Sequence, residues 1–336
     1  MVLIFLVGAC QPKEESSGPV QLSIQGKEFQ VDEPMTPGTM TIFKDHLVKR
    51  MDREEDSVFR IFDLRDDSYC FQALRKGRGP GEIANPAYAA LDEKDGMFWL
   101  ADWSKNCVVR ISLDSLLTDP SYKPSYSFPF DETWIPVKNM FVHPSGNIGF
   151  TSDMLSKQLI SYIDTAGNLV DSLAIPTSVL QHLYDEIGIS EVPLWCLYVP
   201  ERDKIVVASH WENKFWILDL DGRLLLEKDN IPERTTEVYS GNGESSFWGA
   251  CADEKYIYFI YLGGTMINFG EDGDYQTSYP NRILVVDWEG NFRYDIALDH
   301  RIIFFALDKK RKRLICDSEE VDQILLSYDL SWLYEE

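Results

Sequence analysis

The chain has 336 residues, 44% apolar and 13% aromatic, and its 55 acidic side chains outnumber 32 basic ones to give a formal charge of −23. A polyphosphate partner must be neutralised by clustered Lys and Arg, so this balance argues against nucleic-acid binding. The aromatic content excludes a disordered chain, because solvated chains carry far less buriable surface. Length alone would suggest two domains, although all-β folds run longer as one unit.

The chain begins with a short apolar run that is typical of an export signal. Val2–Ala9 carries no charge and is too short to span a bilayer as a helix, but it has the length of a signal-peptide core. The small residues before Cys10 resemble the lipobox of bacterial lipoproteins, in which the cysteine is acylated and becomes the mature N-terminus. We therefore expect a signal peptide over residues 1–9 and lipid attachment at Cys10. No Lys or Arg precedes the run, so we expect a basic region upstream of Met1.

The next segment, Gln11–Gly18, is polar and contains Pro, Gly and Ser, as a flexible tether should. We expect residues 10–18 to form this lipidated tether. A buried N-terminal strand is the alternative, and it would leave the tether unexplained. Lys13-Glu14-Glu15 resembles the acidic export signal of surface-displayed Bacteroidetes lipoproteins. We therefore expect an outer-membrane lipoprotein of the cell envelope, periplasmic or surface-exposed, that touches the membrane through its lipid only.

A repeated strand pattern occupies the rest of the chain. Six segments align without gaps, and each has a polar start, five β-prone residues and a turn. They begin at Ser57, Asn106, Gln158, Asn213, Asn281 and Gln323. The position six residues on is Asp or Ser in every copy: Asp63, Ser112, Asp164, Asp219, Asp287 and Asp329. Such side chains start turns by accepting a backbone N–H two residues ahead, so we interpret them as hairpin punctuation without chemistry. Gly167, Gly222 and Gly290 would complete the turn in three copies.

Each copy has further β runs around it. A β pair lies upstream, over Ala87–Asp102, Lys138–Asp153, Leu194–Ser209, Phe247–Leu262 and Phe304–Ser318. A short run lies downstream, as in Tyr69–Leu74 and Leu169–Ile175. Four antiparallel strands per unit make the blade of a β-propeller, and the copies follow at about the blade period. We predict an all-β, six-bladed β-propeller that forms one domain over residues 19–336.

The two ends of the chain predict how the ring closes. Only Leu330–Glu336 follow the last turn, too little for a fourth strand in blade six. Val20–Ile24 alternates apolar and polar residues like a half-buried strand. We predict that Val20–Ile24 completes blade six and leaves no open edge between the first and last blades.

Two insertions interrupt the repeats. Ser178–Gly188 has the apolar spacing and the Ser cap of one short helix. Gly263–Tyr279, rich in Gly, Asp and Tyr, lengthens the loop between the second and third strands of blade five. Loops of this length in compact domains are often functional.

The cysteines indicate neither a zinc site nor a disulfide framework. With Cys10 lipidated, an odd number remains and none forms a C-x-x-C pair: Cys70, Cys107, Cys196, Cys251 and Cys316. Each sits in or beside an apolar run, so we expect buried free thiols.

The segment Lys76–Glu82, KGRGPGE, lies between blades one and two. It resembles the GRGPGE signature of the TolB-like six-bladed propeller lipoproteins of Bacteroidetes, a group largely of unknown function. Leu100–Asp102, followed by Asn106 and Val108–Arg110, is similar to an NHL repeat. The resemblance covers essentially the whole mature chain and implies the fold and the lipid anchor. It carries no catalytic residues to transfer.

Within this segment Gly and Pro favour a tight crossover between blades. We expect Arg78 and Glu82 to pair with each other or with blade edges. The alternative is that Arg78 faces a ligand near the central channel.

Motifs of known chemistry are missing from the sequence. It has no H-E-x-x-H, G-x-S-x-G, Walker or Rossmann motif and no sialidase-type S-x-D-x-G-x-T-W box. The five histidines are scattered. Lactonase and paraoxonase propellers hold calcium at the channel mouth with carboxylates and Asn, so calcium stays open as a cofactor, with Asp102 or Asp153 as ligands.

The loops between second and third strands share one face of a propeller with the crossovers between blades. We expect this face to concentrate acid and aromatic side chains, and the candidate binding residues are Arg78, Asp102, Trp103, Asp153, His210, Trp211, Asp272, Asp274, Tyr275 and Asp317. Carbohydrate and calcium-bridged sites combine aromatic rings with carboxylates, and Trp and Tyr anchor protein interfaces. The alternative is a solvated acidic rim with Trp103 and Trp211 packed between blades.

Two functional hypotheses follow. The first is a non-enzymatic binding or scaffold module that presents this face to a partner protein or a glycan. The second is a calcium-dependent, lactonase-like hydrolase or lyase that uses channel-mouth carboxylates.

Overall fold

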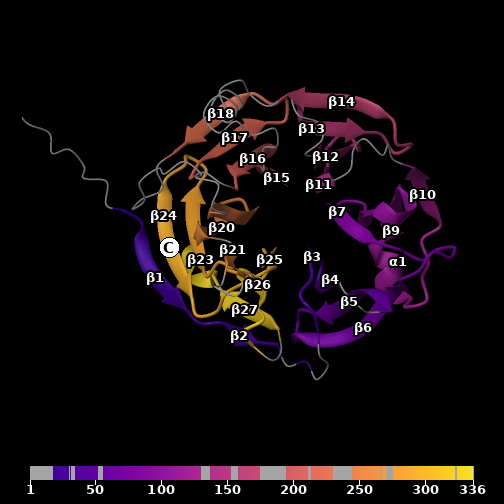
Figure 1. Ribbon diagram of the computed structural model, residues 1–336, viewed down its shortest axis with the longest axis horizontal. Coiled ribbons are helices and arrows are strands. Elements are labelled where there is room, and N and C mark those ends of the chain that lie inside the picture. Colours follow the sequence, from indigo (N-terminus) through magenta and orange to yellow (C-terminus); the bar gives the residue numbers. More distant parts are fainter. Residues whose placement is uncertain are drawn as a thin grey trace, which may run out of the picture.

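The fold is a closed ring of six β-sheets around a central channel, as the repeats predict (Figure 1). The computed structural model describes residues 18–29, 31, 35–51, 56–129, 137–152, 158–174, 194–210, 213–229, 244–265, 267–269, 275–321 and 324–335. Within each sheet the strands follow one another from the channel to the outer rim. The prediction of a six-bladed propeller with four-stranded antiparallel blades is confirmed.

The blades are numbered in chain order. Blade one holds β3 (Met40–Phe43), β4 (His46–Arg50), β5 (Ser57–Asp63) and β6 (Ser68–Arg75). Blade two holds β7 (Pro86–Asp92), β8 (Met97–Asp102), β9 (Cys107–Ser112) and β10 (Tyr126–Pro129). Blade three holds β11 (Val137–Val142), β12 (Ile148–Ser152), β13 (Gln158–Ile163) and β14 (Leu169–Ala174).

The second half of the ring repeats this arrangement. Blade four holds β15 (Leu194–Val199), β16 (Lys204–Ser209), β17 (Phe215–Asp219) and β18 (Leu224–Lys228). Blade five holds β19 (Glu244–Ala252), β20 (Tyr256–Thr265), β23 (Arg282–Asp287) and β24 (Phe292–Leu298). Blade six holds β25 (Phe305–Asp308), β26 (Arg313–Asp317) and β27 (Leu325–Asp329).

The six aligned segments are the third strands of the blades, and their turn residues act as predicted. In five copies the Asp Oδ1 accepts the backbone N–H two residues ahead, at 2.9–3.1 Å. Ser112 instead accepts the Ser115 N–H at 3.2 Å and begins the short helix α1 (Leu113–Thr118). A hydrogen bond from the Asn168 side chain lowers the pKa of Asp164, which keeps that turn carboxylate ionised.

The apolar core is divided among the junctions between blades. Buried side chains form six clusters in the described residues, and each cluster joins two neighbouring blades. Successive residues of a strand point to opposite faces of its sheet, so every blade contributes buried side chains to the clusters on both of its sides. Blade one, for example, packs Val48 against blade two and Leu47 against blade six. This packing holds the inner strands at fixed places around the channel.

The ring closes through a different segment from the one predicted. β1 (Val20–Ile24) pairs in parallel with β24 and adds a fifth strand to blade five. The fourth strand of blade six is β2 (Lys27–Glu28), which pairs antiparallel with β27. The prediction that Val20–Ile24 completes blade six is therefore wrong. Phe29, which follows β2 and is 1% exposed, fills the junction of blades six and one, and this burial favours pairing at β2.

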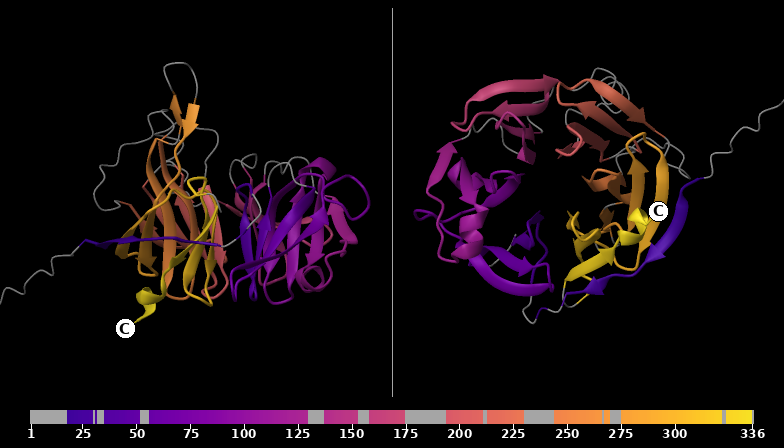
Figure 2. Two further views of the ribbon diagram at one scale, coloured as in Figure 1. Left: turned by 90° about the horizontal axis from the view of Figure 1, so that it is seen from below. Right: turned by 180° about the vertical axis from the view of Figure 1, so that it is seen from behind.

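The long loop of blade five carries its own hairpin. β21 (Ile267–Phe269) pairs with β22 (Tyr275–Thr277), and this hairpin stands above the ring in Figure 2. Two 3-10 turns, η1 (Trp103–Lys105) and η3 (Ser331–Tyr334), complete the described elements. The predicted helix at Ser178–Gly188 lies outside the described residues.

The thiols only partly follow the expectation of burial. Cys196 and Cys316 are buried, and burial raises the pKa of Cys196 to about 12. Cys107 and Cys251 are half-buried. Cys70 on the outer strand β6 is exposed, because outer strands present part of their surface to solvent.

Candidate ligand-binding cavity

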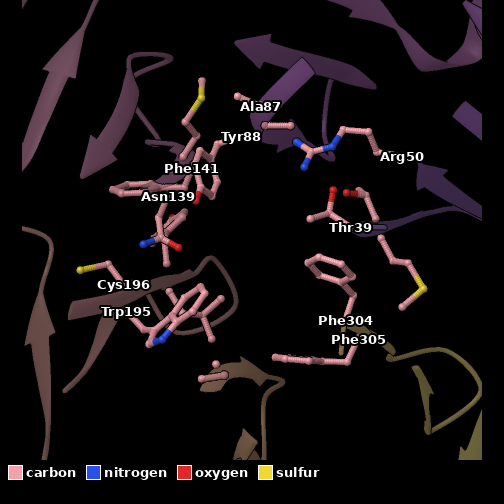
Figure 3. A pocket seen from close by; sticks show the side chains of 18 of the residues that line it. Thr39, Arg50, Ala87, Tyr88, Asn139, Phe141, Trp195, Cys196, Phe304 and Phe305 are labelled. Carbon is pink, nitrogen blue, oxygen red and sulfur yellow. The ribbon is translucent and has the colours of Figure 1, made fainter. Parts of the chain in front are cut away.

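A cavity of about 890 Å³ lies in the central channel (Figure 3). Its lining includes the starts of inner strands and the ends of second strands, so it lies toward the end of the ring that carries the crossovers between blades. Its lining draws on the inner strands of all six blades, β3, β7, β11, β15, β19 and β25. Further lining comes from the ends of β4, β8 and β16, where Arg50, Trp103 and His210 lie. The fold therefore brings residues from most of the sequence to one place.

Aromatic side chains supply much of the wall. Those that line the cavity are Phe59, Tyr88, Phe98, Trp103, Phe141, Trp195, Tyr198, Trp248, Phe304 and Phe305. Several are in ring contact, with centroids of Tyr88 and Trp103 6.3 Å apart and those of Phe141 and Tyr198 5.3 Å apart. Such contacts restrict each ring and pre-form the wall.

His210 joins the aromatic wall of blade four to that of blade five. Its ring centroid lies 6.4 Å from that of Trp195 and 6.4 Å from that of Trp248. His210 Nδ1 lies 2.8 Å from the Phe247 carbonyl oxygen and 3.3 Å from Trp195 Nε1, so the same ring nitrogen is in polar contact with both blades. Trp248 Nε1 donates to the Ile303 carbonyl at 2.7 Å and links the wall to blade six.

Arg50 brings a positive charge to the cavity. It lies two residues after Val48 on β4, so both side chains lie on the face toward blade two, and both line the cavity. Its backbone N–H donates to the Thr39 carbonyl at 2.8 Å, which fixes the end of the strand. Figure 3 shows Arg50, Thr39 and Asn139 around the central space. Asn139 Nδ2 is 3.2 Å from Thr151 Oγ1, which orients that amide.

The cavity differs in charge from the rest of this acidic protein. Among the described residues that line it there is no Asp, Glu or Lys, and Arg50 is the one permanently charged side chain. The described part of this wall therefore carries none of the acidic excess of the chain.

Asp102, a predicted binding residue, holds the backbone instead of facing a ligand. Its side chain is fully buried, and its two oxygens accept the N–H groups of Ala84 at 2.7 Å and Asn85 at 3.0 Å. These hydrogen bonds tie the crossover between blades one and two to the end of β8, the second strand of blade two.

Asp317 plays a similar part where blade six meets blade one. Its side chain is fully buried, forms an ion pair with the fully buried Lys49, and accepts the Gly38 N–H at 2.6 Å. Asp102 and Asp317 each end the second strand of a blade, so the sequence pattern of the two is alike. The sequence could not show that both carboxylates are buried and bound to backbone N–H groups.

The other predicted binding residues have mixed positions. Trp103 and His210 line the cavity, and Arg78 is exposed on the crossover. Tyr275 pairs with Phe269 in the hairpin of blade five. Asp153, Trp211, Asp272 and Asp274 lie outside the described residues.

The glycine-rich crossover is held by local hydrogen bonds. The Glu82 N–H donates to the Gly79 carbonyl at 3.1 Å across Pro80-Gly81, and Gly81 has φ +73°, which are the features of a type II turn. The Glu82 carboxylate accepts the Gly79 N–H at 2.8 Å, and its ion-pair partner is Arg75 at 3.9 Å. Lys105 Nζ donates to the Glu82 carbonyl at 2.6 Å.

Sequence reasoning overlooked one basic run, Lys309–Arg313, in the turn between β25 and β26. Its side chains pair with acids of other turns: Lys309 with Glu201, Lys310 and Arg311 with Asp45, and Arg313 with Asp67. These ion pairs tie blade six to blades one and four at the opposite face from the cavity mouth.

Sequence reasoning also missed Arg50, Asn139 and Trp195, because residues within strands resemble core positions. One signal was present: two successive basic residues, Lys49 and Arg50, end this strand. In the described part of the chain, no group of three or more His, Cys, Asp or Glu side chains is arranged to hold a metal ion. Nor does any described helix have the length and apolar character to cross a membrane.

The fold and the cavity define a six-bladed propeller with a pre-formed central site. The chain belongs to the TolB-like six-blade propeller family, whose model matches residues 19–310. No curated protein matches the chain.

Solved structures with similar folds include two from Bacteroides. One is a member of the DUF4221 family from Bacteroides vulgatus, with a TM-score of 0.61, 9% identity and coverage of 90% of this chain and 94% of that one. Another is a candidate exported protein from Bacteroides fragilis, with a TM-score of 0.56, 10% identity and coverage of 92% and 99%. A third is the calcium-binding protein regucalcin from Agrobacterium tumefaciens, with a TM-score of 0.52, 13% identity and coverage of 92% and 94%. At these identities the likeness concerns the fold alone.

Proposed function

We propose that this protein is an exported, lipid-anchored binding module that takes a ligand into its central cavity and carries out no reaction on it. The observation that carries the proposal is the aromatic cavity built from all six inner strands. Its volume of about 890 Å³ lies in the range of small-ligand sites, roughly 300–1,000 Å³. A wall that belongs to six packed blades needs little rearrangement to bind, which lowers the entropic cost of association.

Two observations support export: the family to which the chain belongs and the likeness of its N-terminal residues to a lipobox. The chain belongs to the TolB-like propellers, and one structure with the same fold is a candidate exported protein. The lipobox-like residues before Cys10 supply the anchor in this proposal, although they lie outside the described residues.

The calcium-dependent enzyme is less well supported. That hypothesis needs carboxylates at the channel mouth, and Asp102 is buried with both oxygens engaged by backbone N–H groups. The described residues of the cavity wall offer no carboxylate to a metal. Aromatic walls instead suit a ligand that stacks, such as the apolar face of a sugar or a flat organic molecule.

A thermal-shift screen with small organic molecules and glycans, run with calcium and with EDTA, tests the proposal. Thr39 points into the cavity, so Thr39→Trp should fill part of it, whereas Thr165→Trp makes the same change in an exposed turn. We expect compounds that raise the melting temperature of the wild type and of Thr165→Trp, in EDTA, but not that of Thr39→Trp. Circular dichroism first establishes that both variants fold.

Two results would contradict the proposal. A shift of several degrees with calcium alone, reversed by EDTA, would favour the enzyme. Ligand shifts that persist in folded Thr39→Trp would place the binding site outside the cavity.

A further inference from the structure

We infer that the cavity selects a ligand with a flat, fused aromatic ring body over a sugar, and that Trp195, His210 and Trp248 form the surface on which this body stacks. This assignment rests on the proposed function, because it requires the cavity to be the ligand site. It adds the chemical class of the ligand and the residues that recognise its shape.

The stacking surface comes from two neighbouring blades. Trp195 lies on β15, His210 follows β16 and Trp248 lies on β19, and all three line the cavity. The His210 ring is tilted by 58° against that of Trp195 and by 48° against that of Trp248, so these rings are not stacked face to face. Figure 3 shows Trp195 at the border of the central space. Rings placed in this way offer offset stacking and edge contacts to a flat aromatic ligand.

The polar atoms of this surface are engaged within the protein. Trp248 Nε1 donates to the Ile303 carbonyl at 2.7 Å. Trp195 Nε1 lies 3.3 Å from His210 Nδ1, and that ring nitrogen is 2.8 Å from the Phe247 carbonyl oxygen. The surface therefore offers a ligand ring faces instead of indole N–H groups. A sugar would lose the water around its hydroxyls here without gaining these donors, and each unmet polar group costs free energy.

Phe305 extends this surface toward blade six. An ideal Cβ on Gly249 of β19 would lie 2.7 Å from Phe305 Cζ, so the Phe305 ring packs directly against the Gly249 backbone. Phe305 and Trp248 also pack against the same buried apolar cluster, which restricts both rings. Because the wall is already ordered, a rigid flat ligand binds with a small loss of conformational entropy, whereas a flexible ligand would itself have to be ordered.

Polar side chains from other blades can bind a substituent of the ring system. Thr39 and Asn139 border the same space in Figure 3, and Asn139 Nδ2 is held 3.2 Å from Thr151 Oγ1. A few neutral hydrogen bonds fix the orientation of a ring system, but they do not replace the water around the many hydroxyls of a sugar. Stacking on ring faces needs no charge on the ligand, so neutral probes test it.

Two neutral competitors with the same carbon skeleton and one hydroxyl test the selection for a flat body. 2-Naphthol is flat and aromatic, whereas trans-decahydro-2-naphthol is saturated and puckered, and each competes with the fluorescent probe N-phenyl-1-naphthylamine. We expect wild type to bind 2-naphthol about fivefold more tightly than its saturated analogue, because only the flat ring stacks. Maltotriose, which represents sugars, should not displace the fluorescent probe.

Variants at Trp195 test whether the proposed surface provides this preference. Trp195→Leu should reduce the preference for 2-naphthol to less than about twofold, because a leucine offers no ring face. Trp195→Phe keeps a ring without the indole N–H and should retain most of the preference. The matched control Trp332→Leu makes the same change on η3, outside the described cavity lining, and should leave the preference unchanged. Circular dichroism first establishes that each variant folds.

The cavity variant separates failure of this inference from failure of the proposed function. Thr39→Trp should weaken binding of the fluorescent probe and of 2-naphthol, which supports the cavity as the site. If it does so but wild type binds both competitors equally, or Trp195→Leu keeps the full preference, the cavity is the site and the selection for a flat ring is overturned. Failure of wild type to bind the fluorescent probe also overturns this selection. If folded Thr39→Trp binds the probe like wild type, the proposed function fails and the inference fails with it.

Discussion

At the scale of single residues, carboxylates divide into those that start turns and those that tie blades together. Asp102 and Asp317 belong to the second kind, each buried at the end of a second strand. Asp317 accepts the N–H of Gly38, where a Cβ would lie 1.8 Å from the Arg50 carbonyl oxygen. Only glycine fits this close approach, so the junction of blades six and one also positions the strand end that carries Arg50.

The buried pair of Lys49 and Asp317 gives a stability prediction. Asp317→Ala leaves the Lys49 charge buried without its carboxylate, which should lower the free energy of unfolding by about 3–5 kcal/mol. The matched control is Asp114→Ala, which breaks the exposed pair with Lys44 and should cost about 0–1 kcal/mol. Urea unfolding measures both values. Equal losses in the two variants would show that burial of the ion pair has no special weight.

At the scale of elements, the two short N-terminal strands have different roles in closing the ring. β1 runs along the outside of blade five, whereas β2 and Phe29 join blade six to blade one. The Phe29 N–H donates to the Leu325 carbonyl at 3.0 Å, and its ring lies 6.5 Å from that of Phe62. Closure therefore depends on a buried aromatic side chain more than on the length of the strand.

These different roles predict that loss of the Phe29 side chain destabilises the protein more than loss of β1 does. Phe29→Ala should lower the free energy of unfolding by about 3–5 kcal/mol, because it opens a cavity between the first and last blades. Removal of residues 19–25 should lower the melting temperature less, since β2 and Phe29 remain to close the ring. Thermal unfolding followed by circular dichroism compares the two. A larger loss from the deletion would mean that β1 is the closing element.

At the scale of the whole molecule, the chain enters the ring on its outer rim. β1 lies along the outside of blade five, and Val20 at its start is 54% exposed (Figure 2). The cavity mouth lies instead at the end of the central channel. A lipid attached upstream of β1 would therefore join the propeller at its side and leave the mouth open to ligand.

The anchor is testable on the whole protein expressed in a bacterial host. We expect the wild type to enter the detergent phase on phase separation and Cys10→Ala to stay in the aqueous phase, because acylation adds buried methylene groups at about 0.8 kcal/mol each. Aqueous partitioning of both forms would rule out the lipid anchor.

The fold could be predicted from the repeats because each repeat specifies its strand and turn through residues that are close together in the chain. Five β-prone residues and an Asp two residues before its hydrogen-bond donor specify a strand and a turn within one short segment, and six copies define the ring. Asp164 and Asp219 act in their turns as the sequence predicts. The apolar runs of the third strands also predict their burial: β5 and β17 are buried along almost their whole length, because both of their faces pack against neighbouring blades.

The cavity and the closing contacts depend on the tertiary structure, since they join residues far apart in the chain. Gly38 and Asp317 meet only when the last blade reaches the first, and no local pattern distinguishes Asp317 from an exposed turn acid. Arg50 and Trp195 look like strand residues in sequence, yet they share a cavity wall because the six blades converge on one axis. The sequence by itself thus determined strands, turns and blade number through short-range hydrogen bonding and periodicity. Only packing between blades decided which segment closes the ring, which acids are buried and where a ligand can bind.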